Sequence, residues 1–173
     1  LALLARPGAR VLAGGTDLLL HQPTWQATTL SQIDPSLDQI ELVDGQIVIG
    51  AACNVAELAL SPLLAAHLPA LPQILQHVAS SAIRQRATVG GNLVNASPIA
   101  DLAVLLLALD AQLSLRSAQG QRCLPLAQFY RGYKQLDLLP GEMLATINFA
   151  LPVGQLHFEK VAHRDYLDIA SVN

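Results

Sequence analysis

Two adjacent glycines, Gly14 and Gly15, follow the short apolar segment 10–13 and form the first pattern that predicts ligand chemistry. Glycine carries no Cβ, so main-chain N–H groups at such a turn can approach a ligand closely. If a helix begins at Thr16, its unbonded N–H groups and the positive end of its dipole favour a phosphate. The alternative is an ordinary glycine turn, because the sequence has neither the Gly-x-Gly-x-x-Gly pattern of Rossmann folds nor a Walker lysine.

A second pair of glycines, Gly90 and Gly91, lies in a segment rich in hydroxyl and amide side chains between Thr88 and Asp101. Two glycine loops far apart in sequence indicate two anchor points for one extended ligand, such as a dinucleotide. The Asp101 carboxylate suits a ribose hydroxyl, which donates a proton, and would repel a phosphate. The same residue also has a structural interpretation, as the N-cap of the apolar helix that begins at Leu102.

Lys160 and Arg164 are four residues apart and have apolar neighbours. A cation beside a flavin ring would stabilise the anionic reduced form and raise its potential. The alternative is an ordinary surface ion pair of either residue with Asp165 or Asp168.

The other ionisable residues predict neither a catalytic nor a metal site. The five histidines have no metal-ligand spacing, and no Ser-His-Asp or Cys-His arrangement is visible. Cys53 and Cys123 are far apart in sequence. That spacing favours two buried, reduced thiols in a cytoplasmic protein over a disulfide framework or an iron–sulfur site.

The composition of the 173 residues excludes several classes of protein. Hydrophobic residues make up 52% and charged residues 13%, which excludes intrinsic disorder. A net charge of −3 and an aromatic content of 4% argue against a nucleic-acid partner. The longest apolar stretch, Leu102 to Leu109, has eight residues, whereas about twenty are needed to span a bilayer, so no membrane span is expected.

Local patterns predict a mixed α and β chain that positions these segments. Asp44-Gly45 between two apolar runs predicts a β-hairpin of residues 40–43 and 46–51. Further strands are expected at 10–13, 28–33, 112–116 and 144–149, and helices at 1–5, 18–20, 54–67, 72–80 and 101–109. Both ends of the sequence stop within a pattern, so we expect a piece cut at both ends.

Taken in order, the three segments resemble the FAD-binding domain of the molybdenum hydroxylase family. That family includes xanthine dehydrogenase and the medium, flavin-carrying subunit of carbon monoxide dehydrogenase. The resemblance rests on Ala13-Gly14-Gly15-Thr16-Asp17, on Ala87-Thr88-Val89-Gly90-Gly91-Asn92 with Ala96-Ser97-Pro98-Ile99-x-Asp101, and on Lys160-x-x-x-Arg164-x-x-x-Asp168-Ile169-Ala170. It runs from about residue 10 to the end of the sequence.

The resemblance implies an α+β fold of the vanillyl-alcohol oxidase or PCMH type. This is a two-lobed FAD-binding domain with mixed sheets, flanking helices and FAD in the cleft between the lobes. We expect a small N-terminal lobe over about residues 1–52 and a larger lobe over about residues 53–173. The family's iron–sulfur domain and its C-terminal flavin-associated domain are expected to be absent from this chain.

The resemblance also implies which residues contact FAD. The first segment would wrap the pyrophosphate through Val11, Leu12, Ala13, Gly14, Gly15, Thr16, Asp17 and Leu18. The second would form another loop from Thr88, Val89, Gly90, Gly91 and Asn92 with Ser97, and Asp101 would bind sugar or ribityl hydroxyls. Further contacts with the cofactor would come from Val78, where the family often has an aromatic residue, from Leu144, and near the isoalloxazine from Lys160 and Ile169. We expect no catalytic residue and no metal ligand in this chain.

The implied function is an FAD-binding electron-transfer module of a molybdenum hydroxylase such as xanthine dehydrogenase. It would accept electrons from iron–sulfur clusters and pass them to NAD or another acceptor. Its partners would be a molybdopterin-binding subunit and an iron–sulfur subunit or domain, with xanthine or a related purine as the expected substrate of the complex. Two alternatives stay open, namely a self-sufficient flavin oxidoreductase of the vanillyl-alcohol oxidase fold and a non-catalytic docking scaffold.

Overall fold

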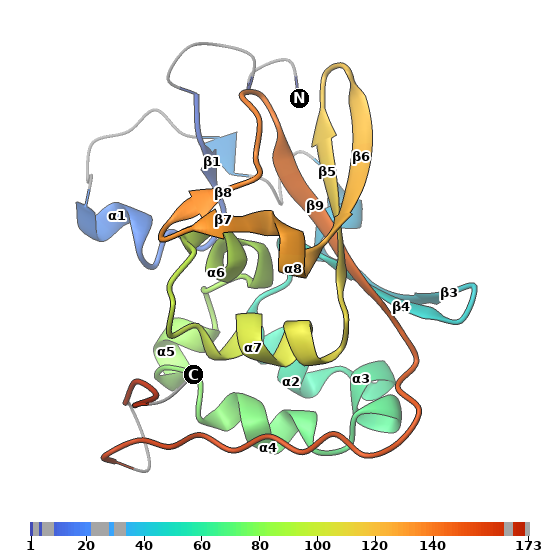
Figure 1. The fold of residues 1–173 in the computed structure, drawn as a ribbon, viewed down its shortest axis with the longest axis vertical. Coiled ribbons are helices and arrows are strands. Elements are labelled where there is room, and N and C mark those ends of the chain that lie inside the picture. The colour runs from blue at the N-terminus through green and yellow to red at the C-terminus, as the bar shows by residue number, and fades with distance from the viewer. Residues whose placement is uncertain (2–3, 5–8, 22–27, 30–33, 165–167, 172–173) are drawn as a thin grey trace.

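The computed structural model describes residues 1, 4, 9–21, 28–29, 34–164 and 168–171. A five-stranded sheet packs against a group of helices, and a small parallel pair of strands lies to one side (Figure 1). The helices and the antiparallel sheet follow one another along the chain without a βαβ repeat. The predicted α+β class is therefore confirmed.

The five-stranded sheet has the order β3-β4-β9-β5-β6, and all neighbouring strands are antiparallel. Its strands are β3 (Ile40–Val43), β4 (Gln46–Gly50), β5 (Gln112–Ser117), β6 (Gly120–Pro125) and β9 (Met143–Ala150). The predicted hairpin is confirmed, because Val43 pairs with Gln46 across a two-residue turn. Asp44 and Gly45 have φ values of 50° and 76°, the positive angles that this turn requires.

The sheet joins distant parts of the chain. Strands β3 and β4 precede the expected lobe boundary near residue 52, and β5, β6 and β9 follow it, yet all of them share one sheet. Strand β9 lies at its centre, between β4 and β5. The division into two lobes stays a prediction.

Most of the helices lie between β4 and β5 in the chain. They are α2 (Val55–Leu60), α3 (Pro62–His67), α4 (Leu71–Gln76), α5 (Ser81–Arg84), α6 (Val89–Asn95) and α7 (Asp101–Ala108), and α8 (Leu126–Phe129) follows β6. The expected helix at 101–109 is confirmed. The expected helix at 72–80 is shorter and begins one residue earlier, as α4.

The single helix expected over 54–67 is wrong, because two helices occupy that range. Asn54 does begin the first with a capping box: its side chain accepts the Glu57 N–H at 2.9 Å, and the Glu57 carboxylate accepts the Asn54 N–H at 2.8 Å. Ser61 then ends α2 and caps α3. Pro62 stands at the first position of α3, where its missing N–H breaks the ladder of helical hydrogen bonds.

The loop expected at the second pair of glycines is also wrong, because these residues form the first turn of α6. Thr88 caps this helix, and its Oγ1 accepts the Gly91 N–H at 3.1 Å. Gly90 packs directly on Ala51, where an added Cβ would lie 2.7 Å from both the Cβ and the carbonyl oxygen. Tertiary packing therefore overrides the low helix propensity of the two glycines.

The smaller elements surround this framework. Strand β1 (Val11–Leu12) pairs in parallel with β2 (Thr28–Thr29), and α1 (Leu18–His21) follows the first glycine turn. A 3₁₀ helix (Pro35–Asp38) precedes β3, and β7 (Tyr130–Gly132) pairs with β8 (Gln135–Leu136). Residues 30–33 of the second expected strand lie outside the described residues, as does most of the expected helix at 1–5.

One hydrophobic core holds the sheet and the helices together. Ile47 and Ile147 contribute from the sheet, and Leu75 and Leu93 contribute from the helices. The irregular segment 151–164 runs back along the helices (Figure 1), and its Leu156 and Phe158 pack against this core. Within the described ranges, no helix has the length and apolar character needed to cross a membrane.

Candidate functional site

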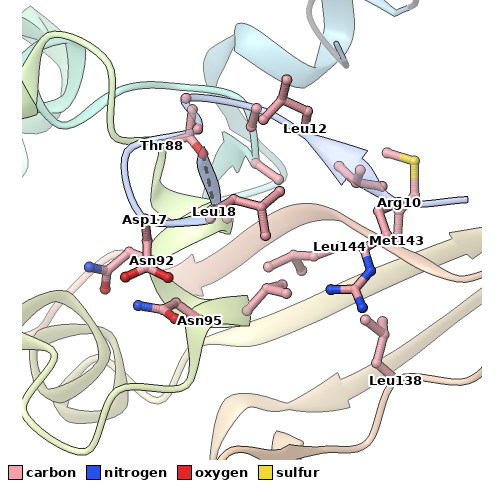
Figure 2. Close-up of a pocket in the computed structure, with 18 of the residues that line it drawn as sticks. Arg10, Leu12, Asp17, Leu18, Thr88, Asn92, Asn95, Leu138, Met143 and Leu144 are labelled. Atoms are coloured by element: carbon pink, nitrogen blue, oxygen red, sulfur yellow. Dashed lines mark hydrogen bonds between the residues drawn. The ribbon is translucent and has the colours of Figure 1, made fainter. Parts of the chain in front are cut away.

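A cavity of about 580 Å³ lies between the N-terminal segment 9–18, helix α6 and the start of β9 (Figure 2). Its volume is within the range of pockets that bind small molecules and cofactors. The segment 10–18 forms one wall, the first turns of α6 form a second, and the connection from β8 to β9 forms a third.

The first glycine turn offers main-chain donors to this cavity. Among the described residues, none accepts a hydrogen bond from the main-chain N–H groups of residues 14–18. Gly15 has a φ of 69°, which a glycine adopts without strain. Gly14 lies so close to the carbonyl group of Arg86 that a Cβ there would have no room. The turn is thus a cradle of donors that suits an anionic group such as a phosphate.

The start of α6 is different, because its main-chain donors are already used. The Val89 N–H donates to the Cys53 carbonyl at 2.9 Å, and the Gly90 N–H donates to the Ala51 carbonyl at 2.9 Å. The next N–H is bonded to Thr88. This segment therefore contributes side chains and close backbone packing to the cavity, and the phosphate donors come from the first glycine turn.

One end of the cavity is polar. Asp17, Asn92 and Asn95 point toward one another there (Figure 2). The Oδ1 atom of Asn92 is buried and has no hydrogen-bond partner among the described residues. A buried acceptor without a partner costs free energy, so this atom suits a hydroxyl donor from a ligand.

The other end of the cavity is apolar. Met143, Leu144 and Leu138 line it, and the Arg10 guanidinium lies beside them (Figure 2). These side chains form a surface for a planar ring, and a guanidinium can stack on such a ring.

The structure brings together most of the predicted cofactor residues. Those that line the cavity are Val11, Leu12, Ala13, Gly14, Gly15, Thr16, Asp17, Leu18, Thr88, Gly90, Gly91, Asn92 and Leu144. Those that do not line it are Val78, Val89, Ser97, Asp101, Lys160 and Ile169. Val89 is fully buried in the core, and Ser97 Oγ accepts the Ile99 N–H. The roles of both groups toward FAD stay predictions.

Sequence reasoning missed several cavity residues. Asn95 had a usable signal, because it lies one helical turn after Asn92 and so shares its face of α6. Arg10, Leu138 and Met143 had none, since only the packing of β9 against the N-terminal segment places them here.

Lys160 and Asp101 form a second polar cluster. The Lys160 Nζ donates to Asp101 Oδ2 at 2.7 Å and to the His77 carbonyl at 3.0 Å. The side chains of Lys160 and Asp101 are each 11% exposed. Ala100 is the N-cap of α7, so Asp101 is its first residue and not the expected cap. This ion pair fastens segment 151–164 to the helices.

Arg84 fixes the loop that carries Val78 beside this cluster. Its Nη1 donates to the carbonyls of Gln76, Val78 and Ala79 at 3.1, 3.0 and 2.8 Å.

In the C-terminal segment, Ile169 is 62% exposed. The surface-pair interpretation holds for Arg164, which donates to Asp168 at 3.4 Å.

Neither cysteine has the features of a reactive thiol site. Cys53 is buried, and burial raises its pKa to about 12. Cys123 is exposed on β6, so the expectation of two buried thiols is wrong for this residue. Strand β6 is an edge strand, and its outer side chains face solvent.

The described part of the chain contains no group of His, Cys, Asp and Glu able to hold a metal ion.

Arg122 holds the connection from β8 to β9 in place at the cavity. Its guanidinium donates to both carboxylate oxygens of Glu142, at 2.7 and 2.8 Å, and to the carbonyl and side chain of Asp137. The hydrogen bond from Arg122 is the main reason that the pKa of Glu142 lies below its usual value. Because the folded state binds protons less readily than the unfolded chain, the pair stabilises the fold above the ordinary pKa of 4.5.

We therefore expect Arg122→Met to lower the free energy of unfolding by about 2 kcal/mol at neutral pH. The difference from the unsubstituted chain should shrink as the pH falls through 4.5 toward the lowered pKa of Glu142, because protonation of Glu142 removes from the unsubstituted chain the pair that the variant already lacks. Urea unfolding of both chains across this pH range measures the effect. A difference that stays constant with pH would contradict the assignment.

The fold and this cavity define a cofactor-binding domain with a donor turn for an anion and a polar end for hydroxyl groups. Residues 1–152 match the family described as FAD binding domain in molybdopterin dehydrogenase. The chain belongs to this family, which confirms the resemblance and identifies FAD as the cofactor. The buried Asn92 Oδ1 and the donors of the glycine turn fit the hydroxyl and diphosphate groups of FAD.

Comparisons with individual proteins agree. The chain is 37% identical over 154 residues to the alpha subunit of the 6-hydroxypseudooxynicotine dehydrogenase complex of Paenarthrobacter nicotinovorans, covering 86% of this chain and 52% of that subunit. It is 34% identical over 179 residues to the xanthine dehydrogenase FAD-binding subunit of Escherichia coli O157:H7, covering 98% of this chain and 61% of that subunit.

A solved structure, the reconstituted CO dehydrogenase from Oligotropha carboxidovorans, superposes on the chain with a TM-score of 0.89 at 30% identity. The match covers 98% of this chain and 62% of the solved chain. The chain thus spans about half to three-fifths of the length of these relatives.

Proposed function

We propose that this chain is the FAD-binding electron-transfer module of a molybdenum hydroxylase of the xanthine dehydrogenase type. It would accept electrons from iron–sulfur clusters and pass them to NAD or another acceptor. The observation that carries this proposal is the cavity, which combines the main-chain donors of residues 14–18 with the Asn92 Oδ1 acceptor. Neither has a hydrogen-bond partner within the part of the chain that the structure describes. FAD, when bound, supplies an acceptor for two electrons, and the chain's own residues position it.

The residues of the cavity divide the binding between them. The main-chain N–H groups of residues 14–18 hold the diphosphate, as at other glycine-rich turns. Asn92 and Asp17 accept hydrogen bonds from hydroxyl groups of the cofactor. The apolar end at Leu144 and Met143 packs on one of its rings and excludes water. No residue of the cavity is given an acid–base role.

The second cluster extends this proposal beyond the cavity. We infer from the family resemblance that the isoalloxazine reaches toward Lys160, Val78 and Ile169. Asp101, the partner of Lys160, would then be near the sugar or ribityl hydroxyls. A cation held beside the ring would raise the flavin potential.

The partners proposed for the complex are a molybdopterin-binding subunit and an iron–sulfur subunit or domain. Support comes from the relatives, which are named as subunits or chains of dehydrogenases. Substrate oxidation, with xanthine or a related purine as the proposed substrate, would take place on a partner.

The direct test is whether the purified chain retains FAD after gel filtration, measured by its absorption spectrum. We expect flavin bands in the unsubstituted chain and their loss in Gly91→Val. Gly91 is exposed to the cavity, and its added Cβ would meet only the Thr88 hydroxyl, at 2.9 Å. The valine side chain would therefore occupy space needed by the cofactor without entering the core.

A control is Ala82→Val, which places the same valine side chain at an exposed position of the short helix α5, outside the cavity. This variant should retain FAD. A chain that binds no flavin would overturn the proposal and favour the docking-scaffold alternative. Undiminished flavin in Gly91→Val would overturn the position given to the cofactor.

A further inference from the structure

The hairpin of β7 and β8 forms part of the cavity wall that faces the N-terminal segment, and its turn carries Lys134 (Figure 1). The base of the hairpin is fixed to the scaffold at two places. The Tyr130 hydroxyl donates to the Leu93 carbonyl of α6 at 3.2 Å, and the Asp137 N–H donates to the Phe129 carbonyl at 2.8 Å. The turn is therefore held over the cavity by α6 and α8.

Lys134 stands at this turn in an unfavourable backbone conformation. Its φ is 52°, in the left-handed region where glycine is preferred and a lysine is strained. Its side chain is exposed and lines the cavity, and none of the described residues forms a hydrogen bond or ion pair with it. Residues with strained backbone conformations cluster at ligand-binding sites, so the conformation of Lys134 at the cavity wall favours a binding role for its side chain.

The charges of the cavity show what this ammonium group would bind. The charged side chains that line it are Arg10, Asp17, Lys134 and Glu142, and Glu142 is bonded to Arg122. The diphosphate of FAD is anionic, whereas the glycine turn supplies main-chain dipoles and the Thr16 hydroxyl but no cation, and the nearby Asp17 carboxylate repels it. Arg10 lies at the apolar end beside Met143 and Leu144 (Figure 2). Lys134 is the remaining cation of the described cavity.

We propose that Lys134 is a further binding residue for FAD, with its ammonium group pairing with the diphosphate from the side opposite the glycine turn. This inference rests on the proposed FAD-binding function. The strained turn aims the lysine at the cavity, and a point charge on a flexible stem suits phosphate oxygens. Binding of FAD should accordingly depend on salt, and binding of riboflavin, which has no phosphate, should not.

The test is a fluorescence titration of the 173-residue chain with FAD and with riboflavin. Lys134→Met should weaken FAD binding about tenfold, the scale of one partly exposed charge-assisted bond, and leave riboflavin binding unchanged. Lys134→Arg should keep most of the FAD affinity. Lys134→Gly should lose as much affinity as the methionine variant, although glycine relieves the strain at a φ of 52° and so preserves the hairpin.

Arg116→Met is the control, because it removes one positive charge on β5 from a residue that does not line the cavity. Its FAD affinity and salt dependence should match those of the unsubstituted chain.

If the unsubstituted chain binds FAD and the Lys134→Met and Lys134→Gly variants bind it equally well, the assignment of Lys134 is wrong and the proposed function stands. Equal weakening of FAD and riboflavin would also overturn it, since that result indicates a structural effect. If the unsubstituted chain binds no FAD, the proposed function itself fails.

Discussion

Gly14→Ala should remove most of the FAD affinity of this chain. The alanine Cβ would meet the carbonyl group of Arg86 well inside van der Waals contact, and this neighbour is main chain that cannot rotate away. The N-terminal segment must therefore shift, and its donors at residues 14–18 shift with it. A strain of about 1–3 kcal/mol is typical of such overpacking, which corresponds to a loss of affinity of up to about 100-fold. Titration with FAD measures the loss.

Gly45→Ala is the matched control for this substitution. Gly45 has a φ of 76° at the tip of the β3–β4 hairpin, and an added Cβ there meets nothing within 4 Å. We expect this variant to lose about 1 kcal/mol of stability through backbone strain and to bind FAD normally. Unchanged FAD affinity in Gly14→Ala would show that the glycine turn is not the diphosphate site.

The two pairs of glycines show what local sequence can and cannot predict. At Gly14 and Gly15, a short strand followed by a turn was predicted correctly, because the apolar run and the glycines act within a few residues. At Gly90 and Gly91, the same pattern belongs to a helix. The difference lies in a distant residue, Ala51, whose backbone approaches so closely that only glycine fits. Such an approach is set by the way Ala51, just after β4, packs on α6, and it leaves no local signal.

Strong local signals elsewhere were sufficient. The Asp44-Gly45 turn fixed the register of its hairpin, and Asn54 fixed the start of α2. The end of α2 was missed because Ser61 serves two helices at once, as the C-cap of α2 and the N-cap of α3, although the proline that follows it is itself a local signal of a helix boundary. The cavity was predicted in outline because its main residues lie in two short segments, whereas its third wall comes from residues 134–144.

Lys160 and Asp101 were both singled out in the sequence, but their contact joins residues 59 positions apart. No pattern in either segment indicates this pair. Its low exposure, 11% on each side chain, makes it the ion pair whose loss should matter most to the fold. A nearly buried charge that loses its partner is left without compensation.

We therefore expect Lys160→Met to destabilise the fold by about 3 kcal/mol, because Asp101 would keep its charge in a desolvated position. Thermal unfolding should show a decrease in Tm of about 10 °C for a chain of this size. Arg131→Met is the comparison, because Arg131 is 65% exposed in its pair with Asp137. That exposed pair should contribute at most about 1 kcal/mol.

The double variant Asp101→Leu and Lys160→Met separates the structural role of this pair from a role in holding FAD. Removing both charges leaves no unpaired ion, so the Tm should recover most of the loss. FAD affinity should be lower than that of the unsubstituted chain, because the hydroxyl acceptor on Asp101 and the cation proposed near the isoalloxazine are both gone. Recovery of stability together with full FAD affinity would instead mean that the pair only fastens segment 151–164 to the helices.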